Sequence, residues 1–213
     1  MLFQRSHTSL RQTGDEKLME LLNRGDHAAL DELYSRYSTR LLAYFDRMLD
    51  RDTALAQDFL HDLFLKIIER PSMFDTSRSF PTWMYSIAHN MCKNEFRRRQ
   101  VRLHQSFEDD EHAAEHVDYA KLVDHADFAR VLDDELSRLA ADMRTTFLLR
   151  YQDELSVREI ALIVDVPEGT VKSRLFNIAQ RLSRRLAVYR PGTGINTDFD
   201  VNLDLEINNE RYG

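Results

Sequence analysis

The sequence contains few of the residues that interrupt helices or link distant segments. Only six of its 213 residues are Gly and four are Pro, and this scarcity favours helices over turn-rich β folds. Its single cysteine, Cys92, can form neither an internal disulfide nor a cysteine-pair metal site. No apolar run approaches the roughly 20 residues of a membrane-spanning helix, and the run MLFQRSHTSLRQ lacks a signal-peptide apolar stretch. We therefore expect an all-α, cytoplasmic protein without membrane insertion.

Charge is distributed unevenly along the chain. The net charge of −7 is unusual for a protein that binds nucleic acid. Residues 106–135 hold 11 acids and two bases, and residues 191–213 hold five acids and one base. Residues 93–102, in contrast, hold five bases and one acid, and residues 168–190 hold six bases and one acid. These two basic stretches can contact phosphates although the whole molecule is acidic.

Apolar periodicity divides the chain into two helical blocks. The expected helices span residues 15–23, 26–50, 53–70, 81–101, 128–139, 141–153, 157–164 and 168–189, with N-caps at Asp26, Asp52 or Thr53, and Ser156, the last in a capping box with Glu159. The predicted organisation is a disordered leader (1–14), a helical domain (15–102), a flexible acidic linker (103–127), a second helical domain (128–190) and an acidic tail (191–213).

The segments 157–164, 165–167 and 168–189 have helix-turn-helix dimensions. In the second helix Val171, Leu175, Ile178 and Leu182 form a buried stripe, and the opposite face carries Ser173, Phe176, Asn177, Gln180 and Arg184, flanked by Lys172, Arg174 and Arg181. Base-reading and phosphate-binding groups on one face are typical of a helix that enters the major groove. The alternative is a solvated basic surface, against which the exposed ring of Phe176 argues.

Two helices of the first block carry unusual faces. In the helix 81–101 one face holds Trp83, Ser86, Asn90, Lys93, Asn94 and Arg97, followed by Arg98 and Arg99. An indole, amides and cations suit unstacked bases and their backbone, or else Trp83 packs on the preceding loop and the arginines are solvated. In the helix 53–70 one face holds Asp58, His61, Asp62, Lys66 and Glu69 around Leu65. A leucine ringed by charges is typical of a protein–protein contact, although isolated exposed leucines are common.

The run LSVREIALIVDVPEGTVKSRLFNIAQRLSRRL resembles region 4 of the extracytoplasmic-function (ECF) sigma factors, the group IV sigma-70-type subunits of bacterial RNA polymerase. Its most specific part is GTVKSRLF. In that family this helix enters the major groove of the −35 promoter element. The resemblance implies −35 contacts by Lys172, Ser173, Arg174, Phe176, Asn177 and Arg181. Asn177 stands where the family usually has Arg, and Asn favours adenine edges whereas Arg favours guanine.

The run TWMYSIAHNMCKNEFRRR resembles regions 2.3 and 2.4 of the same family, which read and melt the −10 element. The resemblance implies that Asn90 contacts a −10 base and that the loop 74–80 cradles a flipped-out base. The implied −10 residues are Phe74, Phe80, Trp83, Asn90, Lys93, Asn94, Arg97 and Arg98.

The run AQDFLHDLFLKI resembles region 2.2, which docks on the β′ clamp helices of RNA polymerase. This resemblance implies polymerase contacts by Asp58, His61, Asp62, Leu65 and Lys66, with His61 in place of the family's common Gln. The likeness covers about residues 15–185. It implies a sigma factor rather than an enzyme, with no cofactor, that binds core RNA polymerase (β′ clamp helices and β flap), promoter DNA and an anti-sigma factor.

Two other functions are compatible with parts of the sequence. A metal enzyme could use His104, His112, His116 and His125, but no motif such as HExxH accompanies them, and solvated histidines are the simpler interpretation. A polymerase-independent regulator could share the helix-turn-helix and would normally dimerise on two half-sites.

The tail contains the alternating run DFDVNLDLEIN, a strand pattern in a helical chain. A single strand needs a partner. The tail therefore docks on a partner, covers the basic domain, or stays a solvated disordered segment.

Overall fold

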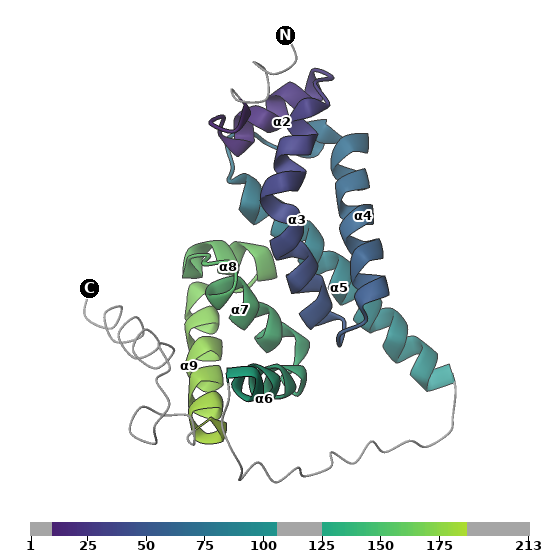
Figure 1. Ribbon diagram of the computed structural model, residues 1–213. Coiled ribbons are helices and arrows are strands. Elements are labelled where there is room, and N and C mark those ends of the chain that lie inside the picture. The colour runs from purple at the N-terminus through teal and green to yellow at the C-terminus, as the bar shows by residue number, and fades with distance from the viewer. Residues whose placement is uncertain (1–9, 106–124, 187–213) are drawn as a thin grey trace, which may run out of the picture.

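A computed structural model describes residues 10–105 and 125–186, with side chains at 10–102 and 130–186 (Figure 1). Every regular element in these stretches is a helix, which confirms the all-α prediction. The elements are α2 (Asp15–Asn23), α3 (Ala28–Met48), α4 (Thr53–Glu69), the short 3-10 helix η1 (Pro71–Met73), α5 (Phe80–Gln105), α6 (His125–Ser137), α7 (Ala141–Tyr151), α8 (Val157–Val164) and α9 (Glu168–Arg185). None of the described helices is long and apolar enough to cross a membrane.

Side-chain capping is clearest at the starts of α4 and α8. Asp52 caps α4 by accepting a hydrogen bond from the Leu55 amide at 3.1 Å, and the capping box of Ser156 and Glu159 is present at α8. The assigned helix α3 begins after His27, and the carboxylate of Asp26 accepts from the Ala28 amide at 3.1 Å, so Asp26 supplies the predicted capping hydrogen bond. Helices α5 and α6 reach into the predicted linker, and the rest of the linker, the residues before Leu10 and the alternating tail lie outside the described residues.

The first half of the molecule packs α2, α3, α4 and α5 around buried aromatic rings. Tyr44, Phe45 and Phe80 are fully buried, and Phe45 meets the ring of Phe59 edge-on at 5.6 Å. Edge-to-face contacts of this kind add stability beyond the area that they bury. The carboxylate of Glu16 in α2 accepts from the Phe80 amide at 3.1 Å, so the start of α5 is fixed to α2.

The second half contains the predicted helix-turn-helix. Helix α8 ends at Asp165, whose left-handed backbone (φ 54°) closes the helix while the Val166 amide bonds back to the Ala161 carbonyl at 3.1 Å. Pro167 then precedes α9, as its missing N–H permits at a helix start. The predicted stripe of α9 is buried, which leaves the opposite face of this helix toward solvent.

The two halves pack directly against each other, an arrangement that the sequence did not predict (Figure 1). Arg144 of α7 is only 6% exposed and reaches the end of α3. Its guanidinium donates to the Asp50 carboxylate at 2.8 Å and to the carbonyl oxygens of Arg47 and Met48 at 3.2 and 3.3 Å. It also donates to the carbonyl of Ser137 within its own half. One buried cation therefore joins α7 to the α3–α4 turn.

A second buried contact joins α5 to the loop before α8. The Tyr85 hydroxyl donates to Asp153 at 2.5 Å, and both side chains are buried. Burial raises the pKa of Asp153 to about 6, against the hydrogen bond from Tyr85, which lowers it. Thr82, one turn earlier in α5, donates to Glu159 of α8 at 3.5 Å. The side of α5 that carries Thr82 and Tyr85 is therefore covered by the second half.

Candidate nucleic-acid interface

Helix α9 presents a mixed polar and aromatic face to solvent. Lys172, Ser173, Phe176 and Asn177 are exposed, and the Phe176 ring keeps 47% of its surface in water. An apolar ring held outward on a helix with a hydroxyl, an amide and a cation beside it can touch a thymine methyl group while its neighbours bind base edges and phosphates. This geometry is compatible with the predicted insertion into a major groove.

The predicted −10 face of α5 is divided between two cavities. Trp83, Asn90 and Asn94 line a cavity of about 510 Å³ between α5, the end of α4 and η1. Lys93 and Arg97 instead line a cavity of about 240 Å³ that faces α7. A helical wheel places all five on one broad face, but the packing of the second half against α5 separates the amides from these two cations.

The larger cavity includes residues that periodicity could not identify. Arg70 follows α4, Met73 is the last residue of η1, and Ile87 lies between Trp83 and Asn90 in α5. Arg70 and Met73 lie in a segment that turns back at Pro71, where a helical pattern no longer relates one residue to the next. In the sequence, only the helix-stopping Pro71 indicated that the chain turns here and that residues beside it could pack near the helix 81–101.

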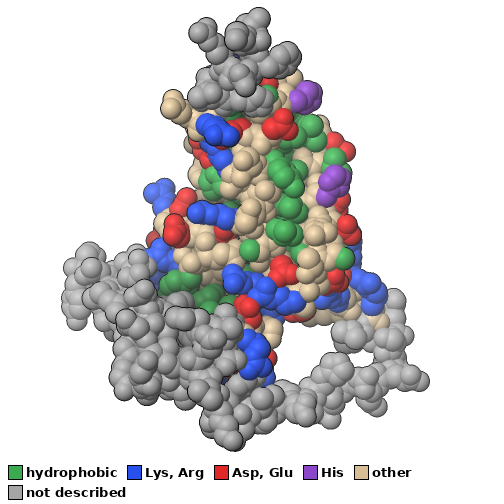
Figure 2. Space-filling model, viewed as in Figure 1, with side chains coloured by type: hydrophobic (Ala, Val, Ile, Leu, Met, Phe, Trp, Pro, Cys, Tyr) green, Lys and Arg blue, Asp and Glu red, His purple; other side chains and the backbone are tan. Residues whose placement is uncertain are grey.

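The predicted polymerase face of α4 is exposed as a whole. Its members all lie toward solvent: Asp58, His61, Asp62, Leu65 and Lys66. Leu65 keeps 41% of its surface exposed, and Tyr34 of α3 keeps 47%. Figure 2 shows apolar side chains in a band between α3 and α4, with acidic side chains beside it. An exposed apolar strip with a charged rim is typical of a protein-binding surface.

Comparison with known proteins identifies both helical blocks. Residues 33–102 match the family described as Sigma-70 region 2, and residues 129–182 match Sigma-70, region 4. RNA polymerase sigma-H factor of Pseudomonas aeruginosa is 30% identical over 188 residues, which cover 83% of this chain and 96% of that protein. The ECF RNA polymerase sigma-E factor of Haemophilus influenzae is 29% identical over 185 residues, which cover 82% and 96%. The chain belongs to the ECF family of RNA polymerase sigma factors.

Its function is promoter-specific transcription initiation, as the resemblance implied. Two solved structures share the fold of this sigma factor. CnrH in complex with the cytosolic domain of CnrY has a TM-score of 0.61 at 21% identity, covering 83% of this chain and 99% of that chain. The sigma factor RpoE in complex with the anti-sigma factor NepR from Bartonella quintana has a TM-score of 0.61 at 24% identity, covering 75% and 98%.

Region 4 engages two of its predicted phosphate-binding cations in ion pairs of its own. Arg174 pairs with Asp142 of α7 at 3.1 Å, and its side chain is 20% exposed. Arg181 approaches the buried carboxylate of Glu135 at 3.5 Å, and Arg185 approaches it at 3.4 Å. Because a buried carboxylate is costly without such partners, Arg181 helps to hold α6 against α9. The predicted −35 contacts of Arg174 and Arg181 stay predictions.

Two rings at the ends of the loop before α5 pack against Trp83, which lines the larger cavity. Phe74 is 6% exposed and Phe80 is fully buried. Their ring centroids lie 5.1 and 6.0 Å from that of Trp83. Both rings have almost no exposed surface in this structure, and the contact of this loop with a flipped base stays a prediction. Trp83 packs on this loop, as one of the two alternatives held, and it also lines the larger cavity, while its contact with a base stays a prediction.

The described residues hold no cluster of three or more His, Cys, Asp or Glu side chains that could bind a metal ion. The side chains of His104, His112, His116 and His125 lie outside the described residues.

Burial raises the pKa of Cys92 to about 12, so the thiol stays protonated and unreactive at neutral pH. Arg98, the last of the predicted −10 cations, is exposed and approaches Glu95 at 4.0 Å.

Proposed function

We propose that this sigma factor captures an unstacked −10 base in the larger cavity of α5 and reads the −35 element with α9. The observation that carries this proposal is the convergence of Trp83, Asn90 and Asn94 on one open cavity of about 510 Å³. That volume lies within the range of roughly 300–1,000 Å³ that small organic ligands occupy. A nucleobase can stack against the indole while the amides meet its polar edge.

The electrostatics of the cavity favour a nucleotide over an uncharged ligand. Lys66 and Arg70 are exposed residues of its lining and can bind the backbone phosphates on either side of a captured base. Glu69 also lines it and disfavours a phosphate deep inside. The base therefore enters and the phosphates remain at the border, as single-strand capture requires.

Region 4 supplies the second promoter contact in this proposal. Lys172 and Ser173 bind phosphates, Phe176 touches a methyl group, and Asn177 selects adenine at its position. Each basic surface is small, so free promoter affinity is weak and sensitive to salt. Core polymerase strengthens it by holding both regions at one spacing, which raises the effective concentration of the second contact.

The partners proposed for this chain follow from its family. The α4 face, centred on Leu65, docks on the β′ clamp helices, and region 4 docks on the β flap. An anti-sigma factor is a further partner, supported by the similar RpoE, which was solved bound to the anti-sigma factor NepR. We assign the chain to group IV and place it in the bacterial cytoplasm, where core polymerase acts. Its contribution is binding alone, without a chemical step or a cofactor.

Transcription reconstituted with core RNA polymerase tests the promoter proposal. The chain should direct transcripts from a single start site on promoters selected from a random library. Asn90→Ala should lower transcript yield about tenfold, because one lost base contact of about 1–2 kcal/mol weakens promoter capture. The matched control is Asn23→Ala, an exposed amide at the end of α2. Equal yields from Asn90→Ala and the control would contradict the role of the cavity.

Polymerase docking by α4 has a separate test. Leu65→Asp should weaken binding to core polymerase more than tenfold, because the new carboxylate would be desolvated in the contact. Val101→Asp places the same charge on another exposed apolar position, 51% exposed near the end of α5, and should leave the affinity unchanged. Fluorescence anisotropy with labelled sigma factor measures both. If Leu65→Asp binds core polymerase with wild-type affinity, the α4 face is not the docking surface.

A further inference from the structure

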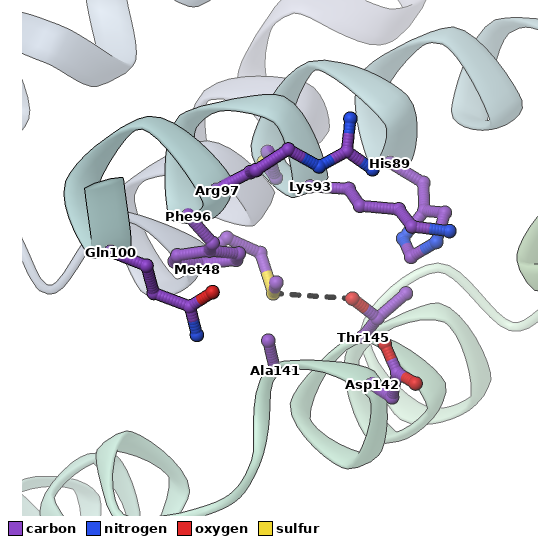
Figure 3. A pocket seen from close by; sticks show the side chains of 10 residues that line it. Met48, His89, Lys93, Phe96, Arg97, Gln100, Ala141, Asp142 and Thr145 are labelled. Atoms are coloured by element: carbon purple, nitrogen blue, oxygen red, sulfur yellow. Dashed lines mark hydrogen bonds between the residues drawn. The ribbon is translucent and has the colours of Figure 1, made fainter.

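The smaller cavity, of about 240 Å³, lies between α5 and the start of α7 (Figure 3). Its α5 wall carries His89, Lys93 and Arg97, and its α7 wall begins at Ala141. Figure 3 shows the imidazole of His89 and the amine of Lys93 directed toward the first turn of α7. The cavity therefore joins side chains of region 2 to a helix N-terminus of region 4.

The helix N-terminus at this cavity has no side-chain cap. Ala140 occupies the N-cap position of the 11-residue helix α7 and has no side chain that could accept a hydrogen bond. The amides of Met143 and Arg144 bond to the Ala140 carbonyl. The amides of Ala141 and Asp142 donate to no acceptor among the described residues. Free amides at a helix N-terminus favour an anion.

A buried polar atom in the same cavity also lacks a partner. His89 is 6% exposed, and no hydrogen bond reaches its Nδ1 atom from the described residues. Burial lowers the pKa of His89, and the cations of Lys93 and Arg174 lower it further against the opposing effect of Asp142. Because Nδ1 is hidden from solvent, the nitrogen through which the neutral ring can donate to a ligand is Nε2. Among the described residues the buried imidazole has no hydrogen-bond partner, and an acceptor bound in the cavity would provide one.

The charges around the cavity also favour an anion. Lys93 and Arg97 are exposed, and neither forms an ion pair with another described residue. Asp142 is the acid in the wall, and its carboxylate is paired with Arg174 at 3.1 Å. The net charge facing the cavity is therefore positive. Its volume is below the range of roughly 300–1,000 Å³ typical of organic ligands, which favours a small ion.

We propose that this cavity binds a small tetrahedral oxyanion, with inorganic phosphate as the representative ligand. Its oxygens would accept hydrogen bonds from the amides of Ala141 and Asp142, from the Lys93 ammonium and from His89. The site is formed only when the two regions are packed together. Such a ligand stabilises the packed arrangement by binding to it alone. Promoter reading does not require this binding, so the two proposals can fail independently.

Calorimetric titration of the full chain with inorganic phosphate, at constant ionic strength in a phosphate-free buffer, tests the site. One phosphate should bind per chain. Lys93→Gln should weaken binding about tenfold by removing a charge-assisted hydrogen bond. Ala141→Pro should weaken it several-fold, since proline removes one amide donor yet is tolerated at the first position of a helix. The extended backbone of Ala140 (φ −55°, ψ 144°) also suits a following proline.

Arg78→Gln is the charge-matched control, because that side chain is 77% exposed and lies outside this cavity. Its phosphate affinity should equal that of the wild type. Phosphate should also raise the melting temperature of the wild type and of Arg78→Gln equally, and that of Lys93→Gln by less at the same phosphate concentration. Absence of binding at millimolar phosphate, or equal affinity in all four proteins, would overturn the proposal.

Discussion

Replacing Arg144 with methionine should separate the two regions of this sigma factor. Methionine keeps most of the apolar length of arginine but removes every donor. The carbonyl oxygens of Arg47 and Met48 would then be left without the guanidinium that bonds to them at 3.2 and 3.3 Å. Breaking a buried charge contact of this kind costs about 3 kcal/mol or more. Because Arg144 joins α7 to the end of α3, this loss of free energy mainly weakens the packing of region 4 against region 2.

Small-angle X-ray scattering and urea unfolding can separate this effect from general damage. Arg144→Met should increase the radius of gyration and lower the free energy of unfolding, with intact helix content by circular dichroism. Arg158→Met is the control, since this arginine is exposed on α8. It should match the wild type in both measurements. A radius of gyration unchanged in Arg144→Met would mean that other contacts suffice to hold the regions together.

The helices of this protein were largely predictable because their signals are local. Spacing identified residues 15–23 and 157–164 without error, and the capping box at Ser156 fixed the start of α8. Such features depend on neighbours within one turn of helix. Asp26 also located the start of α3 to within two residues, because its carboxylate accepts from the amide of Ala28, the first assigned residue of that helix.

The contacts between the regions were not predictable for a physical reason. Arg144 lies within the expected helix 141–153 with the pattern of an ordinary surface arginine, and nothing nearby indicates its burial. Its partner Asp50 is 94 residues away and takes a left-handed backbone, φ 58°, after α3. The same limit applies to Lys93, which a helical wheel groups with Asn90 although the docked α7 separates them. Tertiary packing decided each of these outcomes.

The second large effect concerns Asp153, which lies in the contact between the regions. Its side chain is almost fully buried, and burial raises its pKa from 3.8 to about 6. The hydrogen bond from Tyr85 and the charge of Arg40 oppose this rise without cancelling it. The folded protein therefore binds the Asp153 proton more tightly than the unfolded chain does. This contribution to stability is complete below about pH 4 and is lost as the pH rises through about 6.

Asp153→Asn should consequently stabilise the protein at pH 8 by about 3 kcal/mol, since each pKa unit of the shift from 3.8 to about 6 corresponds to about 1.4 kcal/mol. Asparagine keeps an oxygen that accepts from Tyr85 and removes the buried charge. Urea unfolding between about pH 4 and 8 should show a flatter profile than the wild type. Asp62→Asn, an exposed carboxylate on α4, should keep the wild-type profile.

Tyr85→Phe provides the opposite test of the same contact. It removes the donor that bonds to Asp153 at 2.5 Å, so the ionised carboxylate loses its nearest stabilising group. The pKa of Asp153 should rise further, and stability should fall more steeply between about pH 5 and 8 than in the wild type. In the double variant with Asp153→Asn this added pH dependence should disappear, because no carboxylate remains to titrate. A steep profile that persists in the double variant would assign the effect to another buried group.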